Sequence, residues 1–105
     1  MKAIIEGVRY DTEKATLIGE ASYGFAGDFA RWEASLYVSP RARRYFLAGE
    51  GGPMSFWAEN GDQPGERRSG SGIKPMSKAA ALEWAERHLS AGQIEAGFSA
   101  DIEDA

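Results

Sequence analysis

The sequence predicts an α+β fold: an antiparallel sheet of three to four strands with a short N-terminal helical turn and one or two C-terminal helices. Two observations lead to this prediction. Residues 31–38 alternate apolar with polar side chains, which is the period of a half-buried strand. Residues 78–89 instead place apolar side chains at helical spacing. The change of period indicates that strands come first along the chain and helices last.

The N-terminal residues 2–10 favour a strand that Gly7 interrupts with a tight turn or bulge. Asp11 or Thr12 can cap residues 13–15, whose composition favours one helical turn. We therefore expect a strand, a turn and a helical turn before the main sheet begins.

The central part of the sequence contains the clearest strand pair. A strand is expected over residues 16–21, and the glycines of residues 22–28 indicate a loop after it. The alternating residues 31–38 and the aromatic residues within 44–49 are separated by a turn that contains Pro40. These two segments should pair as an antiparallel hairpin.

The C-terminal part should be helical. Ser77 is a natural N-cap for a helix over residues 78–89. Gly92 is expected to separate it from a shorter helix, in which Ile94 and Phe98 lie four residues apart on one face.

The whole chain, residues 1–105, should form a single domain, because a domain of this length buries roughly two-thirds of its unfolded surface. Residues 60–72 are polar and rich in glycine, so we expect a mobile loop there. Residues 99–105 form an acidic tail. The sequence has no cysteine, no signal peptide and no apolar stretch of membrane length, so we expect a soluble cytoplasmic protein without disulfides.

The residues needed for common catalytic sites are missing. His88 is the one histidine, so neither a catalytic triad nor a zinc site with two histidines can be assembled. The glycine-rich residues 49–52 and 70–72 lack the rest of a nucleotide-binding motif. Glu83 and Glu86 are expected on the exposed side of a helix. We therefore expect no enzyme activity, no cofactor and no metal.

The negative charge of the protein is concentrated near the C-terminus. The net charge is −4, and residues 1–77 hold equal numbers of acidic and basic side chains. From residue 78 onward, Lys78 and Arg87 oppose six carboxylates. These six are the candidate partner-binding residues: Glu83, Glu86, Glu95, Asp101, Glu103 and Asp104. Such a surface can attract a basic partner, although a solvated helix face and a frayed tail explain the same residues.

An alternative site is basic. Five arginines crowd two predicted turns, and Tyr37 and Tyr45 flank the first of them. The arginines are Arg41, Arg43, Arg44, Arg67 and Arg68. A nucleic-acid-binding or autoregulatory protein could use them to bind phosphates while the tyrosines stack on bases. Direct nucleic-acid binding is nevertheless the less favoured hypothesis, because the protein is acidic overall and a hairpin tip is often simply solvated.

A third hypothesis is a structural domain that associates with itself through exposed aromatic side chains. The candidates are Phe25, Phe29, Trp32 and Trp57. The sequence alone does not define the oligomeric state.

Four segments serve as landmarks along the chain: residues 2–15 with the pattern Tyr10-Asp11-Thr12-x-x-Ala15, Leu36-Tyr37, residues 45–52 and residues 81–86 around Trp84. In this order they resemble a family of small bacterial and phage proteins found on mobile genetic elements. The family is similar to proteins described as anti-CRISPR proteins, including inhibitors of type I surveillance complexes.

The resemblance implies a function that the residues alone do not. It implies an inhibitor that acts in the cytoplasm of a bacterial host cell. The inhibitor would bind a Cas protein subunit of a type I CRISPR effector (Cascade) stoichiometrically and block the binding of target DNA. Within that expectation the six carboxylates would mimic DNA by pairing with arginines and lysines that otherwise hold phosphates. The landmarks themselves indicate structural roles, with Tyr10, Phe46, Leu47 and Trp84 as core residues and Gly49, Gly51 and Gly52 as positions that need the backbone geometry of glycine.

Overall fold

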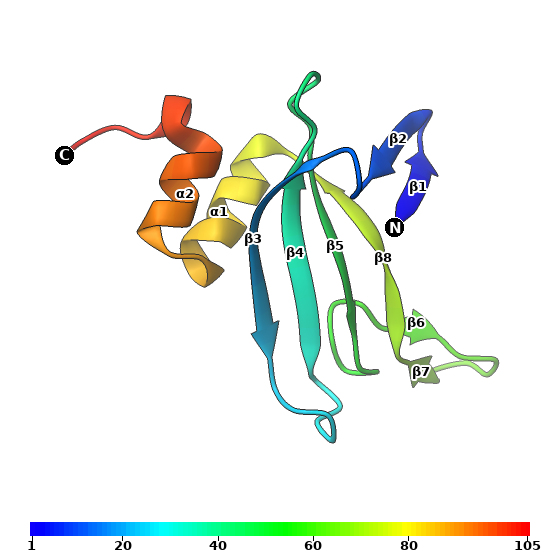
Figure 1. Cartoon of the computed structure of the whole chain (residues 1–105). Coiled ribbons are helices and arrows are strands. Elements are labelled where there is room, and N and C mark those ends of the chain that lie inside the picture. Colours follow the sequence, from blue (N-terminus) through cyan, green and yellow to red (C-terminus); the bar gives the residue numbers. More distant parts are fainter.

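The computed structural model describes all 105 residues and has the predicted α+β architecture. Its centre is a four-stranded antiparallel sheet in the order β3-β4-β5-β8 (Figure 1). The four strands are β3 (Thr16–Tyr23), β4 (Trp32–Val38), β5 (Tyr45–Gly51) and β8 (Gly70–Met76). Helices α1 (Lys78–His88) and α2 (Ala91–Phe98) pack on one face, which we call the inner face. Figure 1 shows that the strands extend well below the helices.

The N-terminal hairpin pairs β1 (Lys2–Ile5) with β2 (Val8–Asp11). Glu6 and Gly7 both have positive φ, 51° and 79°, as a two-residue hairpin turn requires, so the predicted turn at Gly7 is confirmed. Tyr10 is buried edge-on against Phe46 on the outer face, with ring centroids 5.3 Å apart. The hairpin therefore covers part of the face opposite the helices.

The expected helical turn over residues 13–15 is instead a single hydrogen-bonded turn. The Lys14 N–H donates to the Asp11 carbonyl oxygen at 3.2 Å, and the Glu13 N–H donates to Asp11 Oδ1 at 3.0 Å. Strand β3 begins at Thr16, which leaves too few residues to propagate a helix.

The β4–β5 hairpin is confirmed. Leu36 pairs with Leu47 and Val38 pairs with Tyr45, and all four side chains are buried on the inner face. Ser39 closes the turn, because its Oγ accepts a hydrogen bond from the Arg44 N–H at 3.0 Å. The alternation of apolar and polar residues therefore identified the central strands correctly.

Residues 60–72 are only partly a loop. The short strands β6 (Glu59–Asn60) and β7 (Arg67–Arg68) pair across it, and Gly70–Met76 forms edge strand β8 along β5. The register runs from Gly51 opposite Gly70 to Tyr45 opposite Met76. An edge position tolerates Pro75 and the glycines of β8, and Gly70 and Gly72 are among the glycines that led to the prediction of a loop.

The helices follow the prediction with one correction. Ser77 Oγ accepts from the Ala80 N–H at 3.1 Å, which caps α1 as expected. Ser90 starts α2 through a capping box with Gln93, so Gly92 lies inside the second helix and does not separate the two. Residues 99–101 of the acidic tail form a short 3₁₀ helix, η1.

The main core lies between the inner face and the helices. Ala81 and Ala85 of α1 are fully buried, and Phe98 of α2 stacks on Tyr45 with centroids 5.1 Å apart. Alanine on the buried side lets α1 lie close to the sheet. Neither helix has the length and apolar character needed to span a membrane.

Candidate functional site

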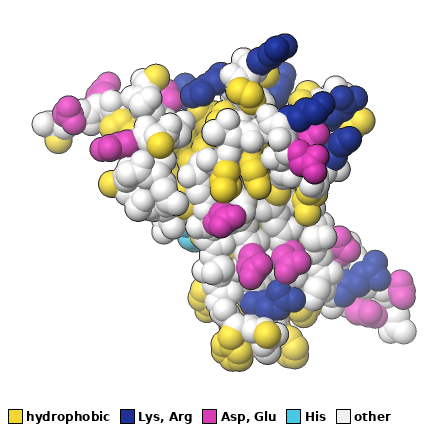
Figure 2. Space-filling model, in the orientation of Figure 1, with side chains coloured by type: hydrophobic (Ala, Val, Ile, Leu, Met, Phe, Trp, Pro, Cys, Tyr) yellow, Lys and Arg dark blue, Asp and Glu magenta, His cyan; other side chains and the backbone are white.

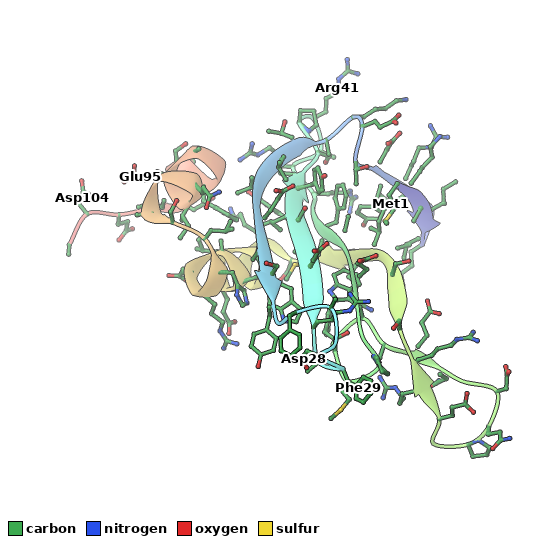
Figure 3. All side chains as sticks on the ribbon, turned by 60° about the horizontal axis from the view of Figure 1, so that its bottom comes forward. Met1, Asp28, Phe29, Arg41, Glu95 and Asp104 are labelled. Atoms are coloured by element: carbon green, nitrogen blue, oxygen red, sulfur yellow. The ribbon has the colours of Figure 1, made fainter.

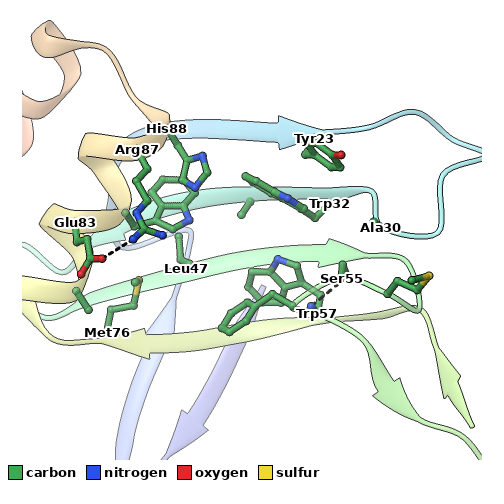
Figure 4. A pocket seen from close by; sticks show the side chains of 15 residues that line it. Tyr23, Ala30, Trp32, Leu47, Ser55, Trp57, Met76, Glu83, Arg87 and His88 are labelled. Atoms are coloured by element: carbon green, nitrogen blue, oxygen red, sulfur yellow. Dashed lines mark hydrogen bonds and ion pairs between the residues drawn. The ribbon is translucent and has the colours of Figure 1, made fainter. Parts of the chain in front are cut away.

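An open groove of about 630 Å³ lies on the inner face beside α1 (Figure 4). Strands β3, β4, β5 and the end of β8 form its base, and residues 54–57 and one side of α1, from Ala80 to His88, form its walls. Eleven of its fifteen lining residues are hydrophobic, and the polar ones include Glu83, Arg87 and His88. A mostly apolar hollow with a few polar groups is the usual form of a binding site.

One wall of the groove exists because β5 has glycines on its inner face. Gly49 and Gly51 leave room for residues 53–58 to fold back over the sheet, and Trp57 lies against Gly49, only 4% exposed. Ser55 Oγ donates to the Gly52 carbonyl oxygen at 2.7 Å and accepts from the Trp57 N–H at 3.2 Å. As predicted, the glycines at positions 49, 51 and 52 allow the backbone to pass close to neighbouring segments where a side chain would not fit.

Lys74 of β8 points onto the same wall. Its Nζ lies 4.8 Å from the ring centroid of Phe56 and 5.4 Å from that of Trp57. The two rings meet edge to face at 5.7 Å. Cation–π contacts of this kind favour one arrangement of an otherwise mobile side chain.

The opposite wall is an aromatic cluster. His88 packs edge-on against Trp32 at 5.1 Å and tilted against Trp84 at 4.9 Å, and the two indoles lie 6.5 Å apart. Glu83 and Arg87 form an ion pair at 2.9 Å on the rim. His88 makes no side-chain hydrogen bond, so its contacts are those of a packing residue.

The six predicted acidic residues divide into two groups. Two are neutralised within the protein, Glu83 by Arg87 and Asp101 by Lys78, each at 2.9 Å. Hydrogen bonding to Asp101 and its negative charge raise the pKa of Lys78 above its ordinary value. The other four are exposed and form no ion pair: Glu86, Glu95, Glu103 and Asp104. Figure 3 shows Glu95 and Asp104 at the same end of the molecule.

The structure adds carboxylates that the sequence analysis did not single out. Glu33 of β4 lies directly opposite Glu50 of β5 on the outer face. Arg31 contacts Glu50 at 3.8 Å, and Ser35 donates to Glu20 at 3.4 Å. The period of two along β4 placed Glu33 on the outside, but the cross-strand pair depends on a register that only the folded sheet defines.

The five arginines do not form one site. Arg41, Arg43 and Arg44 lie at the β4–β5 turn, whereas Arg67 and Arg68 lie on β7, beyond the opposite end of β5. Figure 2 shows Lys and Arg side chains at both of these ends. Arg68 is 3.9 Å from Glu59, while the three arginines of the β4–β5 turn form no ion pair. The β4–β5 turn instead has basic neighbours from near the N-terminus. Arg9 of β2 and Lys14 of the turn after β2 line a hollow of about 110 Å³ together with Arg44.

The exposed aromatic side chains differ from those expected. Phe25 and Phe29 are exposed as predicted, but Trp57 is buried and Trp32 is half-buried in the groove wall. Three further large apolar side chains are exposed beside the groove: Tyr23, Met54 and Phe56. No local pattern indicated that Tyr23 of β3 pairs directly with Trp32 of β4.

The fold and groove define a small α+β protein with a preformed aromatic surface. No group of three or more His, Asp and Glu side chains is arranged to hold a metal ion. Comparisons with protein-family models, with curated protein sequences and with solved structures found no match.

Proposed function

We propose that this protein is a binding protein without enzymatic activity, and that it inhibits a type I CRISPR surveillance complex (Cascade) in the cytoplasm of a bacterial host. Its partner in this proposal is a Cas protein subunit with a basic DNA-binding surface. Stoichiometric binding to that surface prevents the complex from binding its target DNA. The resemblance of residues 2–15 and 45–52 to the anti-CRISPR-containing family supports the choice of partner.

The observation that carries the proposal is the set of four unpaired carboxylates in the C-terminal quarter. Glu86, Glu95, Glu103 and Asp104 are exposed and have no cation of the protein's own beside them. A carboxylate that is free in the unbound protein can pair with an arginine or lysine of a partner without first breaking an internal ion pair. Exposed pairs are each worth about 0.2–1 kcal/mol, and pairs that lose their water contribute more.

Glu83 and Asp101 play a smaller part in this proposal than the sequence suggests. Each must leave its cation before it can bind another, so its net contribution to binding is reduced. The four free carboxylates are therefore the residues to test first.

The test measures how tightly a crRNA-loaded type I complex binds its target duplex in the presence of the purified protein. Saturating protein should abolish duplex binding. A variant with Glu86→Gln, Glu95→Gln, Glu103→Gln and Asp104→Asn should inhibit at least about 30-fold less well, since four pairs of about 0.5 kcal/mol each are lost.

The matched control removes four carboxylates elsewhere. Glu6, Glu13, Asp62 and Glu66 are exposed and form no ion pair, so changing them to Gln or Asn alters the net charge equally. This control should inhibit like the wild-type protein. Unchanged duplex affinity at saturating wild-type protein would refute the CRISPR partner, and equal loss in both variants would refute the C-terminal site.

A second candidate function is nucleic-acid binding at the β4–β5 turn. The observation in its favour is that Arg41, Arg43 and Arg44 are exposed and unpaired. Arg9 and Lys14 stand beside this turn as well. Changing the three turn arginines to alanine should weaken a salt-dependent gel shift of DNA or RNA, whereas changing Arg67 and Arg68 at the far end should not. Absence of any shift at low salt counts against this function.

A further inference from the structure

The β3–β4 loop projects from the lower end of the sheet (Figure 1), and Figure 3 shows Asp28 and Phe29 on it. The loop presents two phenylalanines to solvent. Phe25 and Phe29 are 73% and 67% exposed. The loop is nevertheless ordered by hydrogen bonds of Asp28. Its Oδ1 accepts from the Ala30 N–H at 2.8 Å, and its backbone N–H donates to the Phe25 carbonyl oxygen at 2.9 Å.

The same loop is tied to the wall of the groove. The Met54 N–H donates to the Phe29 carbonyl oxygen at 2.8 Å, and the Gly52 N–H donates to the Arg31 carbonyl oxygen at 2.8 Å. A Cβ on Gly52 would overlap the backbone of Phe29, so this contact depends on glycine. The projecting loop and the groove wall therefore form one preformed surface.

Five large apolar side chains share this surface, which we call the apolar patch. They are Tyr23, Phe25, Phe29, Met54 and Phe56, each between 57% and 74% exposed. Figure 2 shows hydrophobic side chains gathered at this lower end. A large side chain has roughly 150–250 Å² of surface, and 57–74% of each of these five is exposed. The patch therefore presents roughly 500–800 Å². That exceeds the largest apolar patch of many monomers and approaches the roughly 800 Å² that each partner buries in a standard interface.

We propose that the apolar patch and the groove together bind a second copy of this chain. The Phe25 and Phe29 loop of one copy enters the groove of the other, and the reverse contact forms about the same two-fold axis. An isologous interface uses the same surface on both copies, so that surface must be complementary to itself. A surface that combines a projecting loop with a groove meets this condition, because the loop of each copy can fill the groove of the other. Aromatic side chains that enter an apolar hollow are the usual source of interface affinity.

The charges around the surface also fit a second copy. A two-fold axis brings like charges toward one another, so an unbalanced rim would repel its own copy. Here Glu83 on the rim is paired with Arg87, so the two side chains add no net charge. The other cation on the groove wall, Lys74, lies over the rings of Phe56 and Trp57. The rim therefore brings no excess of like charge toward its symmetry mate beyond Lys74.

The first test is the mass of the protein in solution over a concentration range of about 5–500 µM. Sedimentation or light scattering should show a monomer–dimer equilibrium. Changing Phe25→Ser and Phe29→Ser together should raise the dimer dissociation constant at least about 30-fold, as loss of interface anchors does. The matched control, Ile4→Ser with Ile102→Ser, removes exposed apolar side chains elsewhere and should leave the dimer intact.

The second test asks whether the loop enters the groove. The chain has no cysteine, so single cysteines can be placed freely. A Phe25→Cys protein mixed with an Ala80→Cys protein should form a disulfide-linked heterodimer under mild oxidation, because Ala80 lines the groove. Equal linking of Phe25→Cys to itself would overturn the arrangement.

Two results of the first test would overturn the proposal altogether: a monomer at every concentration, or a dimer that is indifferent to the phenylalanine changes. Thermal melting of each variant, followed by circular dichroism, is the control that the variant is folded. This proposal is independent of the CRISPR partner, since none of its variants alters the four free carboxylates.

Discussion

Trp57 lies so close to Gly49 that a Cβ on residue 49 would meet Trp57 Cζ2 at 2.7 Å and would overlap the Glu33 carbonyl oxygen. This contact joins residues 53–58 to the centre of the sheet and shapes one wall of the groove. It is a tertiary contact between a glycine in a strand and a tryptophan in the segment that follows, and it leads directly to the first prediction.

Gly49→Ala should lower the free energy of unfolding by about 1–3 kcal/mol, because Trp57 and the neighbouring strand cannot both make room for a methyl group. Urea denaturation measures the change. Gly92→Ala is the control, since nothing lies within 4 Å of a Cβ there and alanine favours the helix by about 0.5 kcal/mol. A Gly49→Ala protein as stable as wild type would mean that Trp57 does not cover residue 49.

Tyr45→Phe should raise the free energy of unfolding by about 1 kcal/mol. The Tyr45 hydroxyl is buried and has no hydrogen-bond partner, so its removal relieves a desolvation cost while the ring stays stacked on Phe98. Thermal and urea unfolding measure the change. Tyr37→Phe, at a half-buried position on the outer face, should stay within about 0.5 kcal/mol of wild type. A loss of stability in Tyr45→Phe would show that the hydroxyl is satisfied in solution.

Phe98→Ala should lower the free energy of unfolding by about 3–5 kcal/mol, because the side chain is fully buried against Tyr45 and leaves a cavity between α2 and the sheet. Hydrogen exchange should show the largest loss of protection in α2. Ile4→Ala, at an exposed position of the N-terminal hairpin, should change stability by less than about 0.5 kcal/mol. Similar losses for both substitutions would contradict the docking of α2.

The Lys78–Asp101 interaction should disappear at high pH. Because the pKa of Lys78 is raised in the folded protein, its stabilisation is fully present below the ordinary lysine pKa of 10.5. The stabilisation is lost as the pH rises through the raised folded-state value. The difference in unfolding free energy between wild type and Asp101→Asn should therefore be constant from about pH 7 to about pH 9 and shrink above about pH 10.5. A difference that grows in this range would contradict the ion pair.

Local sequence patterns predicted the elements whose burial follows a simple period. The alternation in residues 32–38 identified β4, and the spacing of Ala81 and Ala85 identified α1. Local patterns failed for β8, because its glycines and Pro75 are typical of loops. Residues 70–76 are extended only because β5 supplies a complete set of hydrogen-bonding partners at the sheet edge.

The candidate sites show the same division. The sequence located the excess of carboxylates, but the fold decided that Glu83 and Asp101 are paired while four others are free. The sequence indicated one candidate site of five arginines. The folded sheet separates the three of the β4–β5 turn from the two of β7, which lie at its opposite end. No local pattern indicated the groove, because its walls come from segments as distant as Tyr23, Trp57 and Trp84.

The sequence by itself determined the α+β class, the central hairpin, the caps at Ser77 and the uneven distribution of charge. These features depend on residues close together along the chain, where side-chain period and local hydrogen bonds decide the outcome. Only the tertiary structure decided the place of β8, the pairing of individual charges, and the groove with its apolar patch. They depend on contacts between distant residues, such as Trp57 over Gly49, whose energies exist only once the sheet has formed.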